Sequence, residues 1–220
     1  MNKTKIEYVD YTWNPVTGCL HNCNYCYAKK IAKRFPDNYR EDFMPEFRPE
    51  RLIEPELLKH GAKIFVVSMG DLFGDWVPSD WINKIIKVCE NEQRSTFMFL
   101  TKNPKRYWDF KFPKNCWLGF SASSTSDYLE RIQFVNRMKR NIVFASIEPI
   151  QEPMDLDGTI LPDWIIVGAE TGNRKNAPQP ASWWIENLLK DARNKNVPVF
   201  LKDSLNYRKK INEFPRGKND

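Results

Sequence analysis

The chain has 220 residues, of which 41% are hydrophobic, 14% aromatic and 28% charged, and its formal net charge is +6. This composition excludes a disordered chain, and no apolar run approaches the roughly 18 residues that a membrane span requires. The first ten residues contain no apolar signal-peptide core, so we expect a cytoplasmic protein with no membrane association. The positive charge is compatible with an anionic partner, nucleic acid included.

The first predicted element is a short strand at 15–18, which leads directly into a stretch rich in cysteine. A helix begins in or after that stretch and runs to about residue 35. Residues 37–49 read as an irregular connection, and a short helix is predicted over 49–60. The inward face of the first helix is predicted to consist of Ala28, Ile31, Ala32 and Phe35.

The rest of the chain alternates between continuous apolar runs and amphipathic stretches. Apolar runs without alternation are typical of strands buried on both faces. They cover 63–69, 96–101, 117–121, 142–147, 164–168 and 197–201. The amphipathic stretches predict helices over 78–92, 126–139 and 181–196, with apolar stripes that include Ile82, Ile85, Ile86 and Cys89, and Leu129, Ile132, Val135 and Met138.

Apolar strands separated by helices indicate a parallel sheet. No glycine-rich phosphate loop follows the first strand, which disfavours a dinucleotide-binding fold. A repeat of roughly 25 residues per strand–helix unit fits a barrel. We therefore predict an α/β fold, a partial (β/α)6 TIM-like barrel with parallel strands, as a single domain over 1–207 followed by a basic C-terminal tail over 208–220.

Three cysteines lie within eight residues: Cys19, Cys23 and Cys26. Clustered cysteines in a reducing compartment indicate metal binding or redox chemistry more than disulfides. Three ligands without a fourth leave one metal position open, as catalytic sites do. A zinc site completed by His21 is the alternative, although a C-x3-C spacing and a histidine between two of the cysteines suit it poorly. Cys89 and Cys116 are assigned to the core.

Polar residues follow the ends of the predicted strands. In a parallel barrel these positions share one rim, where active sites lie. Strands also end where burial ends, so any one of these residues has a simpler explanation, whereas the whole set beside a cysteine cluster favours an active site. The set comprises Ser68, Asp71, Thr101, Lys102, Asn103, Ser121, Ser123, Glu148, Glu170, Lys202 and Asp203.

The motif C-x3-C-x-Y-C at 19–26 resembles the signature of radical S-adenosylmethionine (SAM) enzymes. Further segments resemble, in the same order, a phage- and prophage-associated radical-SAM-like family described as a three-cysteine-motif family of unknown function. The resemblance covers nearly the full length. Its segments are 12–15, 68–73, 100–102, 117–119, 146–149, 167–170 and 200–202.

The resemblance implies an enzyme with a [4Fe–4S] cluster on the three cysteines and with SAM bound to the unique iron. An electron from a reductant such as flavodoxin or ferredoxin would cleave SAM to methionine and a 5′-deoxyadenosyl radical, which takes a hydrogen atom from substrate. The cofactors then carry the chemistry, and the protein supplies position and shielding.

The resemblance also assigns residues to SAM. Ser68, Met69, Gly70 and Asp71 occupy the place of the family's Gly-Gly-Glu-type motif, which meets the SAM amino group largely through backbone; here the first position is not glycine and the acid is aspartate. The remaining assignments are Tyr25 beside the adenine, Lys102 at the SAM carboxylate, Ser121 and Ser123 at the ribose, Glu148 at the ribose or substrate, and Ala169 and Glu170 where backbone meets adenine.

Nucleic acid or a nucleotide is the leading substrate class, because basic charge accompanies tryptophans that suit base stacking. These are Trp76, Trp108 and Trp183, which equally suit half-buried packing. An open rim would admit a large substrate or be completed by a partner protein. The alternative function is a nucleic-acid-binding module with a structural zinc or iron–sulfur site and no turnover.

Overall fold

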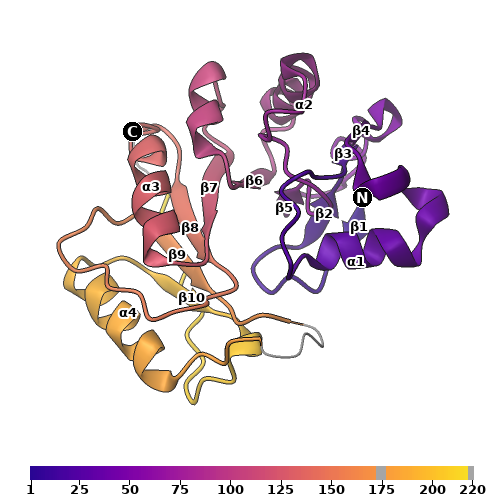
Figure 1. The fold of residues 1–220 in the computed structure, drawn as a ribbon. Helices are drawn as coiled ribbons and strands as arrows, with labels where there is room; N and C mark the ends of the chain where they lie inside the picture. The colour runs from indigo at the N-terminus through magenta and orange to yellow at the C-terminus, as the bar shows by residue number, and fades with distance from the viewer. Residues whose placement is uncertain (172–176, 218–220) are drawn as a thin grey trace. The chain divides into compact units, whose positions relative to one another are not determined.

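A computed structural model describes residues 1–171 and 177–217 and confirms the predicted α/β fold with mostly parallel strands (Figure 1). The chain divides into two compact units, Met1–Trp117 and Leu118–Asp220. Across the described residues, no helix is both long and apolar enough to cross a membrane. Both units alternate strands with helices, as a partial barrel requires.

The first unit is built on a sheet whose strands run in the order β1-β2-β5-β6. β2, β5 and β6 are parallel, and β1 pairs antiparallel with β2. β3 and β4 form a separate antiparallel pair. The bounds are β1 Asn2–Lys3, β2 Tyr11–Trp13, β3 Val16–Thr17, β4 Glu46–Phe47, β5 Lys63–Val66, β6 Thr96–Thr101, α1 Tyr27–Arg34 and α2 Ser79–Asn91.

Two predicted elements of this unit differ from the structure. The strand expected at 15–18 is β3, outside the main sheet, and the strand that pairs with β5 is β2, whose Trp13 is fully buried. In place of the helix over 49–60 there is a short 3₁₀ turn at Pro49–Arg51 followed by turns. Pro55 explains the second difference, because proline lacks an N–H donor and disfavours helical backbone in the preceding residue.

Helix α1 buries a narrower face than its sequence predicts. Ala28 and Ala32 are buried against Phe43 and Met69, whereas Ile31 and Phe35 are 37% and 47% exposed. Helix α2 buries its whole predicted stripe of Ile82, Ile85, Ile86 and Cys89.

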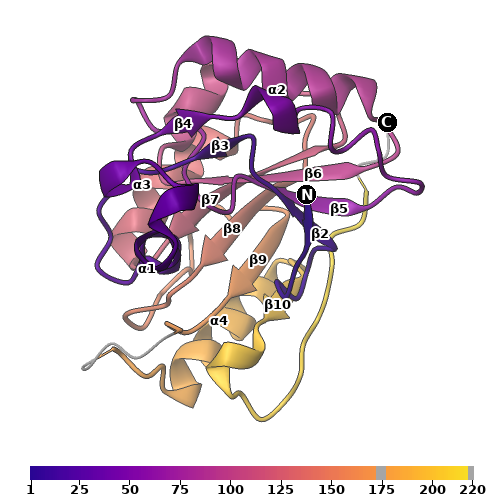
Figure 2. The same ribbon diagram turned by 90° about the vertical axis from the view of Figure 1, so that its right-hand side faces the viewer.

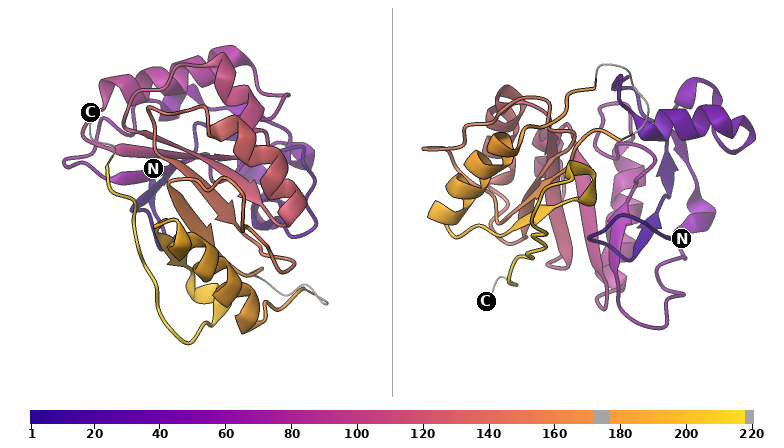
Figure 3. Two further views of the ribbon diagram at one scale, coloured as in Figure 1. Left: turned by 90° about the vertical axis from the view of Figure 1, so that its left-hand side faces the viewer. Right: turned by 90° about the horizontal axis from the view of Figure 1, so that it is seen from below.

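The second unit has four parallel strands in the order β7-β8-β9-β10 (Figure 2). Helices α3 and α4 lie on the same face of these strands (Figure 3). In α3, Ile132 and Val135 are buried as predicted, but Leu129 is 47% exposed. The bounds are β7 Cys116–Ala122, β8 Val143–Ile147, β9 Trp164–Val167, β10 Val199–Leu201, α3 Thr125–Val135 and α4 Ser182–Asn194.

Part of the basic tail is bound to β10. The Leu201 N–H donates to the Ile211 carbonyl at 2.8 Å, and the Glu213 N–H donates to the Val199 carbonyl at 3.1 Å. The Phe214 ring stacks on Trp164 with ring centroids 5.2 Å apart. The chain therefore covers an edge of β10 that would otherwise present unpaired backbone groups.

Candidate functional site: the cysteine loop

The cysteine loop connects β3 to α1. Its three thiols are free and half-buried. Cys26 caps α1: its Sγ accepts from the Lys29 N–H at 3.3 Å, and its own N–H donates to the Cys23 carbonyl at 3.2 Å. The Cys26 sulfur therefore lies at the N-terminal end of α1, where it satisfies one of the free backbone N–H groups of the first turn.

Backbone contacts fix the start of this loop. The Gly18 N–H donates to the Met69 carbonyl at 2.8 Å, and the Cys19 N–H donates to the Phe43 carbonyl at 2.9 Å. Gly18 has φ +96°, and a Cβ there would lie 2.3 Å from the Met44 carbonyl oxygen. A Cβ on Gly70 would lie 2.6 Å from the Gly18 carbonyl oxygen. Only glycine permits this approach of the loop to residues 68–71.

We expect Gly18→Ala to destabilise the metal-free chain by about 3 kcal/mol, from positive-φ strain and the backbone overlap together. The matched control is Gly158→Ala, because Gly158 has φ +69° but open space around its Cβ position. That control should cost about 1 kcal/mol. Urea unfolding compares the two variants, and equal losses would show that the contact with Met44 relaxes.

Asp71 is the buried polar centre of this region. Its Oδ1 accepts from the Phe73 N–H at 3.0 Å and the Thr101 hydroxyl at 2.7 Å. Its Oδ2 interacts with His21 Nε2 at 2.7 Å and accepts from the Lys102 N–H at 2.9 Å. Burial alone would raise the pKa of Asp71, but these hydrogen bonds and the nearby His21 hold that pKa below its ordinary value. The carboxylate is thus fully committed to protein donors.

His21 joins the cysteine loop to Asp71. Besides the contact of its Nε2 with the carboxylate, its ring packs edge-on against Trp76 with centroids 4.8 Å apart. The imidazole is therefore held between Asp71 and Trp76. This arrangement favours an anchoring role over the fourth metal ligand of a Cys3His site.

Lys102 and Tyr25 also lie at the loop. The Lys102 ammonium donates to the Tyr25 hydroxyl at 2.6 Å and lies 5.0 Å from the centroid of its ring. Burial lowers the pKa of Lys102, but the Tyr25 hydroxyl and Cys23 outweigh it, so the pKa is raised overall. The lysine is therefore a cation beside the cysteines.

The segment that begins at Ser68 is held by residues on both sides. The Asn14 side-chain oxygen accepts from the Ser68 hydroxyl at 3.2 Å and the Met69 N–H at 2.9 Å. The Tyr27 hydroxyl donates to the Ser68 carbonyl at 2.6 Å. Because β2, β5 and β6 are parallel, residues 14, 68 and 102 follow the same edge of the sheet.

The three cysteines suit an iron–sulfur cluster by donor chemistry. Burial raises the pKa of the Cys19 thiol to about 12, and the charges of Asp71, Cys23 and Cys26 act in the same direction. A bound metal reverses this effect, because it deprotonates coordinating thiols. Within residues 1–171 and 177–217, no three His, Cys, Asp or Glu side chains are already arranged as a metal site.

The other predicted site residues lie in the second unit. Ser121 and Ser123 are buried, the carbonyl of Ser121 accepts from Arg131 at 2.6 Å, and Ala169 N–H donates to the Ser204 hydroxyl at 3.1 Å. Glu148 forms an ion pair with Lys202. Glu170 follows β9 and is half-buried. Ser121 is the penultimate residue of β7, whereas Ser123, Glu148 and Ala169 follow the carboxyl ends of β7, β8 and β9. Lys202, the partner of Glu148, follows β10.

Sequence reasoning missed several side chains of this region. Asn14 was noted only within the segment 12–15 of the family resemblance, Thr101 only as a polar residue at the end of a predicted strand, and His21 only as a zinc ligand. Ser146 pairs in register with Ser121, and its buried hydroxyl has no hydrogen-bond partner in the described part of the chain. Finding these side chains required knowledge of which strands pair, and the periodicity of the sequence does not provide it.

Solved structures of spore photoproduct lyase share this fold. A doubly substituted form with bound AdoMet and dinucleoside spore photoproduct has TM-score 0.57 and 13% identity over 79% of this chain and 60% of that chain. The complex with dinucleoside spore photoproduct has TM-score 0.54 and 13% identity, covering 76% of this chain and 57% of that one. The chain thus spans about three-fifths of the length of these structures.

Among curated proteins, none matches this sequence. A family model does match, and it spans residues 3–219. That range includes the cysteine loop, Asp71, Lys102 and all of the site residues of the second unit. The chain therefore belongs to the family described as "Protein of unknown function (DUF5131)".

Proposed function

We propose that this chain is a radical SAM enzyme. Cys19, Cys23 and Cys26 would hold a [4Fe–4S] cluster, which supplies one electron to break a carbon–sulfur bond of SAM and so starts hydrogen abstraction from substrate. The observation that carries the proposal is three free thiols on one loop, with no fourth cysteine in it. The start of this loop is bonded through the Gly18 N–H to the Met69 carbonyl, which follows the parallel strand β5. Support also comes from a fold neighbour solved with bound AdoMet.

The chain's own residues would position the cofactors. Asp71 holds the loop through His21, and Lys102 supplies a cation for the SAM carboxylate beside Tyr25. Because both oxygens of Asp71 already accept two donors, the SAM amino group would meet this segment through the backbone around Met69 and Gly70. Ser121, Ser123, Glu148, Ala169 and Glu170 remain proposed contacts to the ribose, adenine or substrate.

A nucleotide or nucleic acid is the proposed substrate class. The net charge of +6 suits a polyanion, and the fold neighbour was solved with a dinucleoside photoproduct. The reductant is proposed to be a flavodoxin or ferredoxin, as the sequence resemblance implies. The association with phage, and the cytoplasmic location expected from the sequence, likewise stay proposals.

Anaerobic reconstitution with iron and sulfide tests the cluster. We expect a brown protein with about four iron atoms and four sulfides per chain and the broad visible absorbance of a [4Fe–4S] cluster. Chemical reduction in the presence of SAM should then yield 5′-deoxyadenosine and methionine. A colourless chain that holds one zinc ion, and releases no 5′-deoxyadenosine, would instead support a nucleic-acid-binding module with a structural metal.

A further inference from the structure

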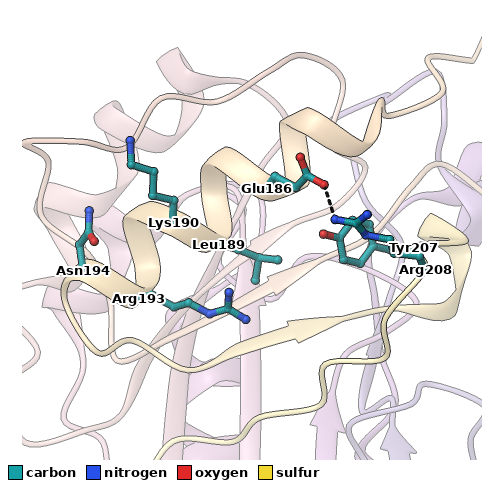
Figure 4. A pocket seen from close by; sticks show the side chains of 7 residues that line it. All are labelled: Glu186, Leu189, Lys190, Arg193, Asn194, Tyr207 and Arg208. Carbon is teal, nitrogen blue, oxygen red and sulfur yellow. Dashed lines mark hydrogen bonds and ion pairs between the residues drawn. The ribbon is translucent and has the colours of Figure 1, made fainter.

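The second unit has an open groove lined by α4 and by the neighbouring residues 207 and 208 (Figure 4). Its volume is about 400 Å³, which accommodates one or two nucleotide-sized groups but not a folded partner. Residues 207 and 208 close one side, and Leu189 contributes apolar surface. The lining residues are Glu186, Leu189, Lys190, Arg193, Asn194, Tyr207 and Arg208.

The groove is basic. Three of its side chains are cations, and its one carboxylate, Glu186, already pairs with Arg208 at 2.9 Å. Lys190 and Arg193 are exposed, and neither forms an ion pair or side-chain hydrogen bond within the described residues. They lie three residues apart on α4 and so share one face of the helix. Two such cations leave the groove with charge that an anion can neutralise.

Aromatic surface accompanies these cations. Trp183 lies seven residues before Lys190, on the same face of α4, and is 51% exposed. Its ring packs edge-on against Trp184, with centroids 6.1 Å apart, which restricts its orientation. Tyr207 adds a second ring within the groove. Cations that alternate with exposed rings are typical of surfaces that bind single-stranded nucleic acid, where phosphates meet cations and bases stack.

We propose that this groove binds single-stranded nucleic acid, with Lys190 and Arg193 at the phosphates and Trp183 and Tyr207 beneath the bases. No cysteine-loop residue takes part, so the proposal stands whether or not the chain cleaves SAM. The groove would hold the strand through its backbone and base faces and would therefore bind with little sequence preference.

Fluorescence anisotropy with a labelled single-stranded oligonucleotide of about 16 nucleotides tests the proposal on the full metal-free chain. Lys190→Gln/Arg193→Gln should weaken binding about 25-fold at about 0.1 M salt and make the slope of log affinity against log salt less negative by about 1.4, since each lost phosphate contact on a single strand removes about 0.7. Trp183→Ala should weaken binding about 5- to 150-fold through lost stacking.

The matched control is Lys59→Gln/Arg140→Gln, which removes the same charge from exposed residues that have no ion-pair partner within residues 1–171 and 177–217. It should leave the affinity within about twofold, and Cys19→Ala should bind like the wild type. Equal weakening by the two double variants would overturn the proposal, as would equally effective competition by polyglutamate or by duplex DNA. Unchanged urea unfolding confirms that the surface variants fold.

Discussion

Replacing Cys19 with alanine is expected to abolish both retention of the cluster and formation of 5′-deoxyadenosine. The loop provides three thiols, and in the described part of the chain the nearby His21 is engaged with Asp71, so no side chain on the loop replaces a lost ligand. Iron and sulfide per chain, the visible absorbance of the cluster and chromatographic detection of 5′-deoxyadenosine measure the loss. We expect cleavage to fall below detection, with methionine and 5′-deoxyadenosine lost together.

Cys89→Ala is the matched control, because Cys89 is a free cysteine buried on α2. It should keep the full iron content and cleavage activity while it loses about 1 kcal/mol of stability, the cost of a small core truncation. Substantial 5′-deoxyadenosine from the Cys19→Ala variant would rule out the proposed ligand set. Loss of iron from both variants would indicate that unfolding, rather than ligation, explains the result.

The regular part of the fold was predictable because periodicity reports burial. The strand predicted at 96–101 is β6, and the predicted apolar stripe of α2 is buried. A strand that is buried on both faces requires a continuous apolar run, and a helix that is buried on one face requires an apolar stripe with a period of 3.6 residues. The failures came where local signals compete. Pro55 interrupts the helix predicted over 49–60. Helix α1 is short and contacts the core through Ala28 and Ala32 alone, so Ile31 and Phe35 stay exposed.

The sequence identified most residues of the candidate site but not the contacts between them. Strand ends identified Asp71 and Lys102, and spacing identified the cysteines. The sequence could not show that Asp71 faces His21 fifty residues earlier, because that contact depends on the bridge between Gly18 and Gly70, which lie on separate segments. Nor could it show that Lys102 bonds Tyr25, which is 77 residues away. Long-range pairing of this kind is a property of the sheet and not of any local segment.

Asp71→Ala is expected to destabilise the metal-free chain by about 3–5 kcal/mol, because it leaves several buried donors without an acceptor. The donors are the N–H groups of Phe73 and Lys102, the Thr101 hydroxyl and the His21 ring. Asp71→Asn should cost less, about 1–3 kcal/mol, because the oxygen that the amide keeps can still accept from two donors. The remaining cost arises because the amide NH₂ group is itself a donor, so the Lys102 N–H that it faces has lost its acceptor. Urea unfolding measures both losses.

Asp75→Ala provides the matched control, since Asp75 lies four residues on, is exposed, and accepts one hydrogen bond, from Asn103 at 2.8 Å. Its loss should cost less than about 1 kcal/mol. A double-mutant cycle of Asp71→Asn with His21→Leu then isolates the link to the cysteine loop, and we expect a coupling of about 1–2 kcal/mol. Both single variants should also lose reconstituted iron faster than Asp75→Ala under a chelator. Zero coupling together with normal iron retention would show that Asp71 supports the sheet edge alone and does not hold the loop.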